Sequence, residues 1–156
     1  MRLLCDGMLG RLTRWLRMLG YDTKYLKVLD DELIEVAERE HRILLTRDLM
    51  LYKRARAHGV RAFLVKGENE AEKLADLAKN LNIKLDIDPS RSRCPKCNSE
   101  IKSVRKEDII NKIPEMTARF HEEFWICKGC GQIYWRGSHW KRIMKTLIEA
   151  KRLAKE

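Results

Sequence analysis

Short apolar runs and helical periods alternate along residues 1–81 of the chain. The apolar runs predict strands at residues 2–5, 21–26, 42–46 and 60–65. Leucines at positions 9, 12, 16 and 19 recur at a helical spacing, which predicts a helix that stops near Gly20. Further helices are predicted over residues 30–40, 49–58 and 68–81. Strands that alternate with helices in this way predict an α/β fold, with a parallel sheet flanked by helices.

The pattern changes after residue 81. Residues 82–93 mix charges with Pro89, which is typical of a linker. Two cysteine pairs follow, and residues 139–156 predict a last helix with apolar residues toward one side. We therefore divide the chain into an α/β domain at residues 1–88 and a smaller unit at residues 89–156, which contains the cysteines and ends in a basic helix.

The charge is unevenly distributed between the two parts. The 156 residues carry a net charge of +10. Residues 1–90 have 17 Lys and Arg against 15 Asp and Glu, whereas residues 91–156 have 16 against 8. These counts give net charges of +2 and +8, and a basic C-terminal part favours nucleic acid as a partner. The alternative is a charged surface that only keeps the protein in solution.

Composition excludes several other classes of protein. Apolar residues make up 44% of the chain, which is enough for a buried core, and no run approaches the ~18 apolar residues of a membrane span. Charges interrupt the N-terminal residues too early for a signal peptide. We expect a cytoplasmic protein with no membrane partner.

Four of the five cysteines form two C-x₂-C pairs, Cys94 with Cys97 and Cys127 with Cys130. Two such pairs complete a tetrahedral set of sulfur ligands, so we expect structural Zn²⁺. An Fe–S cluster is compatible with the spacing, and an intracellular setting disfavours disulfides. Cys5 lies in an apolar strand, where it is expected to act as a small buried hydrophobe.

Carboxylates follow three of the predicted strands. Asp6 comes directly after the first strand, Asp30 and Asp31 open the helix after the second, and Asp48 follows the third. Because the C-terminal ends of parallel strands share one edge of a sheet, these acids can converge there and hold Mg²⁺ or Mn²⁺. Helix capping is the alternative explanation for each of them.

Three segments carry a resemblance to a known family. They are "CDGMLGRLTRWLRMLGYD" (5–22), "DDELIEVAEREHRILLTRD" (30–48) and "FWICKGCGQIYWRGSHW" (124–140). They resemble the Mut7-C family, a PIN-like ribonuclease domain followed by a zinc ribbon. The resemblance implies a metal-binding role for Asp6, Asp30 and Asp48, with Asp31 as a neighbouring catalytic candidate. Such nucleases often have a fourth acid after a further strand; Glu68 and Glu70 are the acids available there, and the sequence assigns neither to the site.

Basic and aromatic residues are candidates for RNA binding. Arg11 and Arg14 lie three residues apart on the helix that follows Asp6, where they can reach a phosphate held by the acids. In the ribbon, the candidates are Arg136, His139, Trp140, Lys141 and Arg142. A solvated helix face and packing of a small core are the alternatives for these two groups.

We expect a metal-dependent endoribonuclease with a PIN-like α/β domain, in which Mg²⁺ or Mn²⁺ is catalytic and the ribbon helps to bind RNA. The main alternative is a non-catalytic module that binds RNA or the ribosome through the ribbon. A third interpretation is an adaptor that grips another protein, such as an RNA-processing protein. The last helix is expected either to dock on the first domain or to bind RNA.

Overall fold

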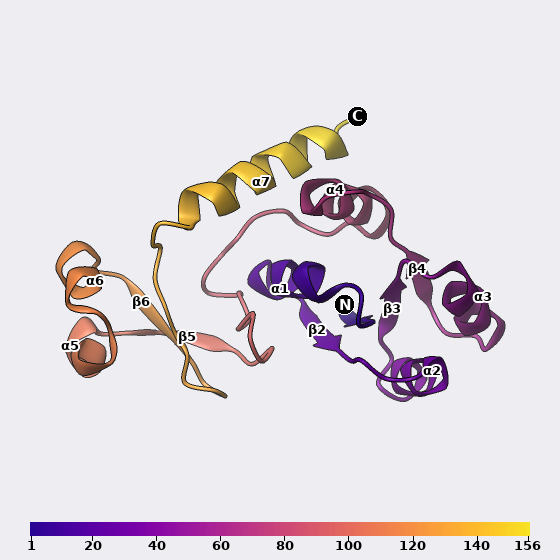
Figure 1. The fold of residues 1–156 in the computed structure, drawn as a ribbon, viewed down its shortest axis with the longest axis horizontal. Coiled ribbons are helices and arrows are strands. Elements are labelled where there is room, and N and C mark those ends of the chain that lie inside the picture. The colour runs from indigo at the N-terminus through magenta and orange to yellow at the C-terminus, as the bar shows by residue number, and fades with distance from the viewer.

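The computed structural model describes all 156 residues and contains a four-stranded parallel sheet (Figure 1). Its strands are β1 (Arg2–Cys5), β2 (Asp22–Tyr25), β3 (Ile43–Thr46) and β4 (Ala62–Leu64). Their order across the sheet is β2-β1-β3-β4, and every neighbouring pair is parallel. All four predicted strands and the predicted parallel sheet are confirmed.

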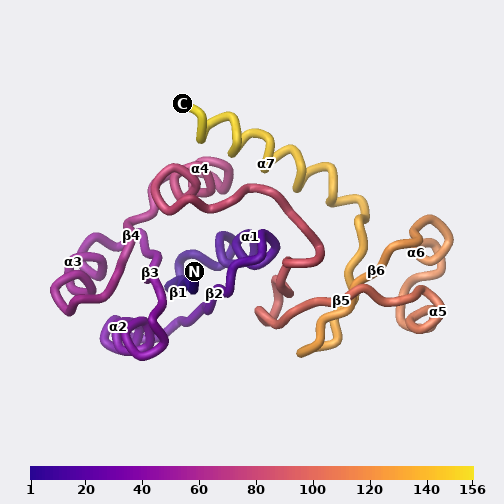
Figure 2. Tube along the Cα trace, turned by 180° about the vertical axis from the view of Figure 1, so that it is seen from behind, coloured from indigo at the N-terminus to yellow at the C-terminus, as the bar shows by residue number.

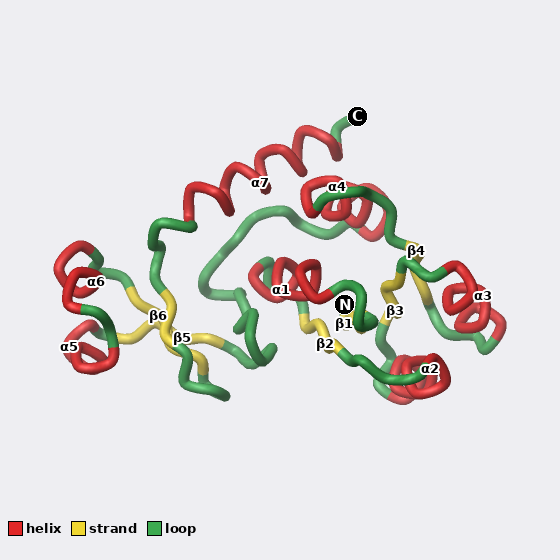
Figure 3. Tube along the Cα trace, viewed as in Figure 1, coloured by secondary structure: helices red, strands yellow, loops and turns green.

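Helices cover both faces of the sheet because side chains along a strand alternate between the faces (Figure 3). Leu3 and Cys5 of β1 point into a core shared with α1 and α4, whereas Leu4 points into a second core shared with α2 and α3. These four predicted helices are confirmed, with bounds α1 (Gly10–Met18), α2 (Asp30–Arg39), α3 (Leu49–Ala57) and α4 (Glu70–Leu81).

The cysteine-containing unit is a small antiparallel sheet of β5 (Ile101–Val104), β6 (Phe124–Cys127) and β7 (Ile133–Tyr134). Three short helical segments between β5 and β6 are additions to the predicted elements; they are α5 (Lys106–Ile109), η1 (Ile110–Lys112) and α6 (Glu115–Phe120). The core of this unit is only Ile109, Phe124 and Ile133, and a core of this size typically needs a metal to supply part of the folding energy.

The last helix, α7 (Trp140–Ala154), returns from the ribbon and lies along α4 (Figures 1 and 2). Leu147 and Ala150 are buried in the same core as α1 and α4. The structure therefore shows this helix docked on the first domain. Residues 82–93 form no helix or strand, but Ile83 and Leu85 are buried in that core too. The segment is thus a packed connection rather than a free linker.

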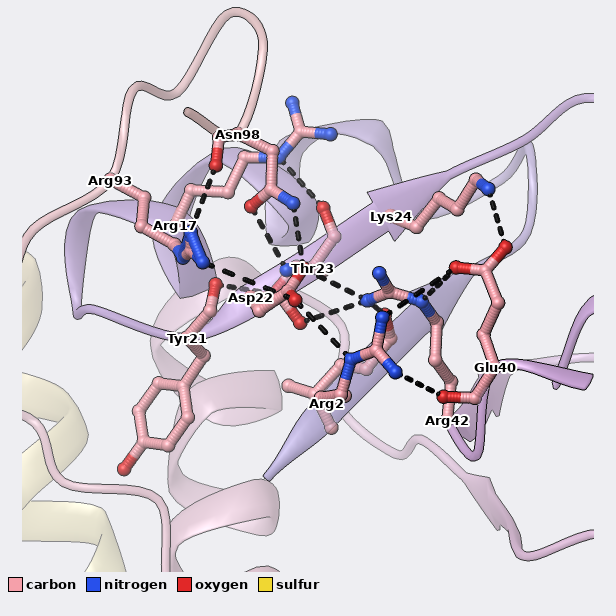
Figure 4. A network of polar contacts seen from close by, with 11 residues as sticks. Arg2, Arg17, Tyr21, Asp22, Thr23, Lys24, Glu40, Arg42, Arg93 and Asn98 are labelled. Carbon is pink, nitrogen blue, oxygen red and sulfur yellow. Dashed lines mark hydrogen bonds and ion pairs between the residues drawn. The ribbon is translucent and has the colours of Figure 1, made fainter. Parts of the chain in front are cut away.

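A polar network joins the ribbon to the parallel sheet, at the edge where the strands begin (Figure 4). Asn98, in the turn of the first cysteine pair, accepts a hydrogen bond from the Thr23 backbone N–H at 3.0 Å and donates to Asp22 at 2.7 Å. Arg17 donates to the carbonyl oxygen of Pro95 in the same turn at 2.9 Å. The cysteine turn is therefore fixed to the edge strand β2.

Arg42 is the buried cation of this network, and its side chain is 6% exposed. It pairs with Asp22 and Glu40, each at 2.9 Å. Burial raises the pKa of Asp22, but hydrogen bonds from Arg42 and Asn98 outweigh burial and lower that pKa to about 2. Hydrogen bonds from Lys24 and Arg42 lower the pKa of Glu40 to about 2 as well. Both carboxylates are therefore ionised at neutral pH, as the pairing with Arg42 requires.

No helix of the structure combines the length and the apolar character that crossing a membrane requires.

The docking of α7 predicts that alanine substitutions at two adjacent residues change the free energy of unfolding by unequal amounts. Leu147 is 1% exposed and Ile148 is 63% exposed. We expect Leu147→Ala to lower the free energy of unfolding by about 3 kcal/mol, because it leaves a cavity in the shared core. Ile148→Ala is the matched control and should change it by less than about 0.5 kcal/mol. Urea denaturation of both variants measures the difference, and equal effects would show that α7 is not docked as described.

Candidate active site and metal centre

The strand order creates a crevice at the C-terminal edge of the sheet. From β1 the chain crosses to β2 on one side, and it later returns to β3 on the other side of β1. Ligands of open parallel sheets bind where the strand order reverses in this way, just beyond the strand ends. Asp6 follows β1, and Asp48 lies two residues beyond the last residue of β3. Two of the predicted acids therefore flank the reversal point.

Thr46, the last residue of β3, connects these two acids. Its hydroxyl donates a hydrogen bond of 2.6 Å to Oδ2 of Asp6 and accepts one of 3.0 Å from the backbone N–H of Asp48. Thr46 is fully buried, so the hydroxyl has a fixed position. The loop that carries Asp48 is thus held in a fixed position relative to the Asp6 carboxylate.

Asp6 is a buried acid with no cationic partner. It is 6% exposed, and its Oδ1 accepts a hydrogen bond of 3.1 Å from the backbone N–H of Met8. Its hydrogen-bond donors, from Met8 and Thr46, are both uncharged. No Lys or Arg nitrogen lies within 4.0 Å of the carboxylate. The alternative explanation of Asp6 as a helix cap does not hold, because α1 begins at Gly10 with Leu9 as its N-cap.

Asp48 caps a helix, as the sequence allowed. Its Oδ1 accepts hydrogen bonds from the backbone N–H groups of Met50 and Leu51, at 2.9 and 3.2 Å, at the start of α3. The residue is exposed, and Oδ2 accepts no hydrogen bond from the protein. Capping uses one carboxylate oxygen, so it leaves the other one for a ligand.

Asp30 and Asp31 are held differently. They lie in the first turn of α2, as predicted, but the N-cap is Leu29 and makes no side-chain cap, so Asp30 is not the cap. Both carboxylates pair with Arg54 of α3, Asp30 at 3.4 Å. This cation neutralises part of their charge. The structure therefore joins Asp6 to Asp48 through Thr46 and places Asp30 and Asp31 in a separate ion pair with α3.

The structure also identifies an acid that the sequence did not assign. Glu70, in the first turn of α4, lines a cavity of about 560 Å³ together with Gly7, Arg11 and Tyr25. One of its oxygens lies 3.2 Å from Lys73, and the other is buried with no hydrogen-bond partner. A buried carboxylate oxygen without a partner is costly unless a donor or a cation meets it. Its place after β4 was visible in the sequence, but its burial was not.

These acids suit a hard divalent cation in their chemistry. Asp6, Asp48 and Glu70 offer carboxylate oxygens, which are the ligands that Mg²⁺ and Mn²⁺ prefer. The unpartnered oxygens of Asp48 and Glu70 are free to accept such an ion. In the structure, however, no three carboxylates have ligand atoms all within 4.8 Å of one another. A bound ion would therefore draw these side chains together.

The four paired cysteines do form a compact cluster, with all sulfur atoms within 4.8 Å of one another. Cys94 and Cys130 are 3.7 Å apart, and Cys97 and Cys127 are 3.4 Å apart. A tetrahedral ion with bonds of about 2.3 Å to sulfur has ligands about 3.8 Å apart, so the cluster fits Zn²⁺. All five cysteines are free thiols, which contradicts the disulfide alternative.

Further contacts orient the sulfur ligands. The backbone N–H groups of Gly129 and Cys130 each donate to the sulfur of Cys127 at 3.3 Å, and the Tyr134 hydroxyl lies 2.9 Å from the sulfur of Cys94. Such hydrogen bonds hold ligands in place around a metal. Cys5, by contrast, is fully buried in the main core, where burial raises the pKa of its thiol to about 12. Its expected role as a small hydrophobe is confirmed.

The candidate RNA-binding residues fall into two groups on the surface. Arg11 and Arg14 are exposed on α1 and form no ion pair within 4.0 Å. At the start of α7, His139, Lys141 and Arg142 are exposed, whereas Trp140 is half-buried. Arg136 lies over the rings of Trp125 and Trp140 and is 3.6 Å from Glu123. These residues are therefore at the surface, where a nucleic acid can reach them.

Comparison with known proteins agrees with this architecture. The model of the Mut7-C RNAse domain matches residues 1–147. A human protein, "Exonuclease mut-7 homolog", is 35% identical over 126 residues, which cover 78% of this chain and 14% of the relative. The chain thus spans about one seventh of that relative's length. No solved structure matches it. The chain belongs to the Mut7-C family, whose domain is of the ribonuclease type.

Proposed function

We propose that the chain is a metal-dependent endoribonuclease whose active site lies at the C-terminal edge of the sheet. The observation that carries the proposal is the buried Asp6 carboxylate, which has neutral partners only and is linked through Thr46 to the loop of Asp48. A buried anion without a cation is costly, and a divalent ion held by Asp6, Asp48 and Glu70 would remove that cost. The nuclease-type family supports hydrolysis of a phosphodiester.

Each residue has a specific part in this reaction. Asp6, Asp48 and Glu70 would hold a divalent ion, which would supply an activated water and would neutralise charge that develops on the phosphate. Thr46 keeps the Asp6 carboxylate in one orientation, and Arg11 at the rim of the Glu70 cavity binds the phosphate of the strand. Asp30 and Asp31 are the further acids of this edge, and we propose that Asp30 joins the site when Arg54 releases it.

The basic surface supports RNA as the substrate. The C-terminal part carries most of the net charge, and the exposed Lys141 and Arg142 have no acidic partner within 4.0 Å. Unpaired cations of this kind bind the phosphates of a nucleic acid. We propose that the zinc ribbon contributes affinity for RNA, while the acids of the first domain cut it.

The first prediction concerns the acids. We expect Asp6→Asn and Asp48→Asn each to lower the rate of RNA cleavage with Mn²⁺ by more than about 100-fold, since residues that only orient metal ligands account for 10–100-fold. Gel analysis of labelled RNA measures the rate, and anisotropy confirms that the variants still bind RNA. Asp108→Asn, an exposed aspartate of the ribbon, is the matched control. Unchanged cleavage in the Asp6 and Asp48 variants would favour a non-catalytic RNA- or ribosome-binding protein.

The position of the cut is a separate prediction. The human relative is named an exonuclease. Asp48 lies exposed at the surface, so a strand can reach this acid from the side, without an end being threaded into a closed tunnel. We therefore expect a circular RNA to be cut at a rate within about tenfold of its linear form. Complete resistance of the circle, with the linear form digested from one end, would identify an exonuclease instead.

The cysteine cluster predicts a structural zinc ion. Cys127→Ser should lose the single Zn²⁺ per chain and lower the melting temperature by more than about 10 °C, since several kcal/mol of folding energy come from the metal. Cys5→Ala is the control and should keep the zinc. Elemental analysis gives the metal content, and circular dichroism gives the melting temperature. Iron in place of zinc in the native protein would support the Fe–S alternative.

A further inference from the structure

A second cavity lies between the α/β domain and the ribbon. Its volume is about 130 Å³, and its walls come from Met18 at the end of α1, Pro89 of the connecting segment, Trp125 and Trp135 of the ribbon, and Trp140 at the start of α7. Arg93 and Arg136 also line it, and no carboxylate does. The cavity therefore combines aromatic walls with positive charge.

In the wall of this cavity, the guanidinium of Arg136 lies over two indole rings. The guanidinium carbon of Arg136 is 5.4 Å from the centre of the Trp125 ring and 5.1 Å from the centre of the Trp140 ring. These are distances at which a cation is attracted to the face of an indole. Arg136 has one acidic neighbour, the exposed Glu123 at 3.6 Å, so the pair is weak and a phosphate can compete for the guanidinium.

The size of the cavity restricts what can enter. An apolar cavity of about 150 Å³ holds a benzene ring, so this one, at about 130 Å³, has room for about one flat ring. A ring that is attracted by indole faces, and that brings an anion for Arg136, has the chemistry of a nucleotide. Bases stack on aromatic side chains with little regard to sequence.

The spacing between the aromatic cavity and the acids suits a single RNA strand that contacts both. Arg11, Arg14 and Met18 are spaced at i, i+3 and i+7 on α1, which puts them on one face of the helix. Arg11 lines the cavity of Glu70, and Met18 lines the aromatic cavity. Arg11 and Met18 are seven residues apart on the helix, which separates them by about 10 Å along its axis. The exposed and unpaired Arg14 lies between them, where it can hold a phosphate.

We propose that the aromatic cavity takes one unpaired base of the RNA strand, while Arg11 and Arg14 hold the phosphates that lead from that base to the acids. The proposal rests on the proposed function for its choice of RNA, and it adds a base-binding subsite to it. A single-stranded stretch beside the cut is then favoured, because a paired base must first lose its pairing and stacking to enter the cavity. The enzyme should therefore cut unpaired RNA faster than a continuous duplex.

Binding of two ligands to the native zinc-loaded chain tests the subsite. The ligands are a labelled oligouridylate and an abasic strand of the same length, and Mg²⁺ and Mn²⁺ are left out so that nothing is cut. We expect the native chain to bind the oligouridylate roughly tenfold more tightly than the abasic strand. Trp140→Leu should remove this preference, because it keeps an apolar side chain but loses the stacking face. The slope of affinity against salt should stay the same, since no phosphate contact is lost.

Phe120→Leu is the matched control, because Phe120 is a 69% exposed aromatic residue of the ribbon outside the cavity. It should keep the preference for the oligouridylate. Equal affinity of the native chain for the two strands would overturn the proposal, and so would a preference that survives Trp140→Leu. If the native chain binds neither strand but binds a peptide with an exposed aromatic residue, the cavity belongs to a protein partner and the proposal fails.

A measurement on the native chain avoids any question of folding. An oligouridylate that contains 4-thiouridine should crosslink to the peptides that contain Trp125 or Trp140, as found by mass spectrometry. Crosslinks confined to other peptides would contradict the subsite. These experiments need no cleavage, so a protein that fails to cut RNA but crosslinks at the cavity would disprove the proposed function and leave the subsite standing.

Discussion

The packing of α7 against α4 is the contact on which the arrangement of the molecule depends. Leu147 and Ala150 of α7 enter the core that β1, α1 and α4 also form, and Ile83 and Leu85 of the connecting segment enter the same core. Burial of an aliphatic side chain stabilises the fold by about 1.5–3 kcal/mol. The ribbon, whose own core has three buried residues, is therefore anchored at both of its ends. This double attachment brings Trp140 and Met18 into the walls of one aromatic cavity.

The acidic edge follows from a different constraint. Parallel strands end at one edge, and the strand order puts the ends of β1 and β3 side by side there. Thr46 then fixes the spacing, because its buried hydroxyl bonds to Asp6 and accepts the N–H of Asp48. A buried carboxylate with two neutral donors and no cation is an expensive feature for a domain of this size. A cation bound there during function would offset this cost.

The sequence predicted the α/β domain well, because apolar periods determine where strands and helices form. The cysteine cluster was predictable for a similar reason, since a C-x₂-C pair is a local motif. The partners of Asp30 and Asp31 were not predictable, because Arg54 comes from another helix. The short helices α5 and α6 were also missed, since segments of this length have a weak periodic pattern.

Long-range contacts explain the remaining differences between the predicted and observed site. Glu70 was one of two candidate acids after β4, with Glu68, and only the packing of α4 shows that one of its oxygens is buried without a partner. Asn98 directly follows the first cysteine pair, and no local pattern shows that it joins the ribbon to Thr23 and Asp22. Residues 82–93 had the composition of a linker, although two of their side chains are in the main core. Such partners depend on the tertiary fold, which local patterns do not encode.

The most direct test of the metal-binding active site is the anomalous diffraction of manganese in crystals grown with Mn²⁺. We expect a manganese peak at the ends of β1 and β3, with oxygens of Asp6 and Asp48 at about 2.1 Å, as in other carboxylate sites of hard cations. The carboxylate of Glu70 should turn toward the same ion. If crystals saturated with Mn²⁺ show no peak at this edge, and Asp6 keeps only Met8 and Thr46 as partners, the acids are structural and the account of the active site is wrong.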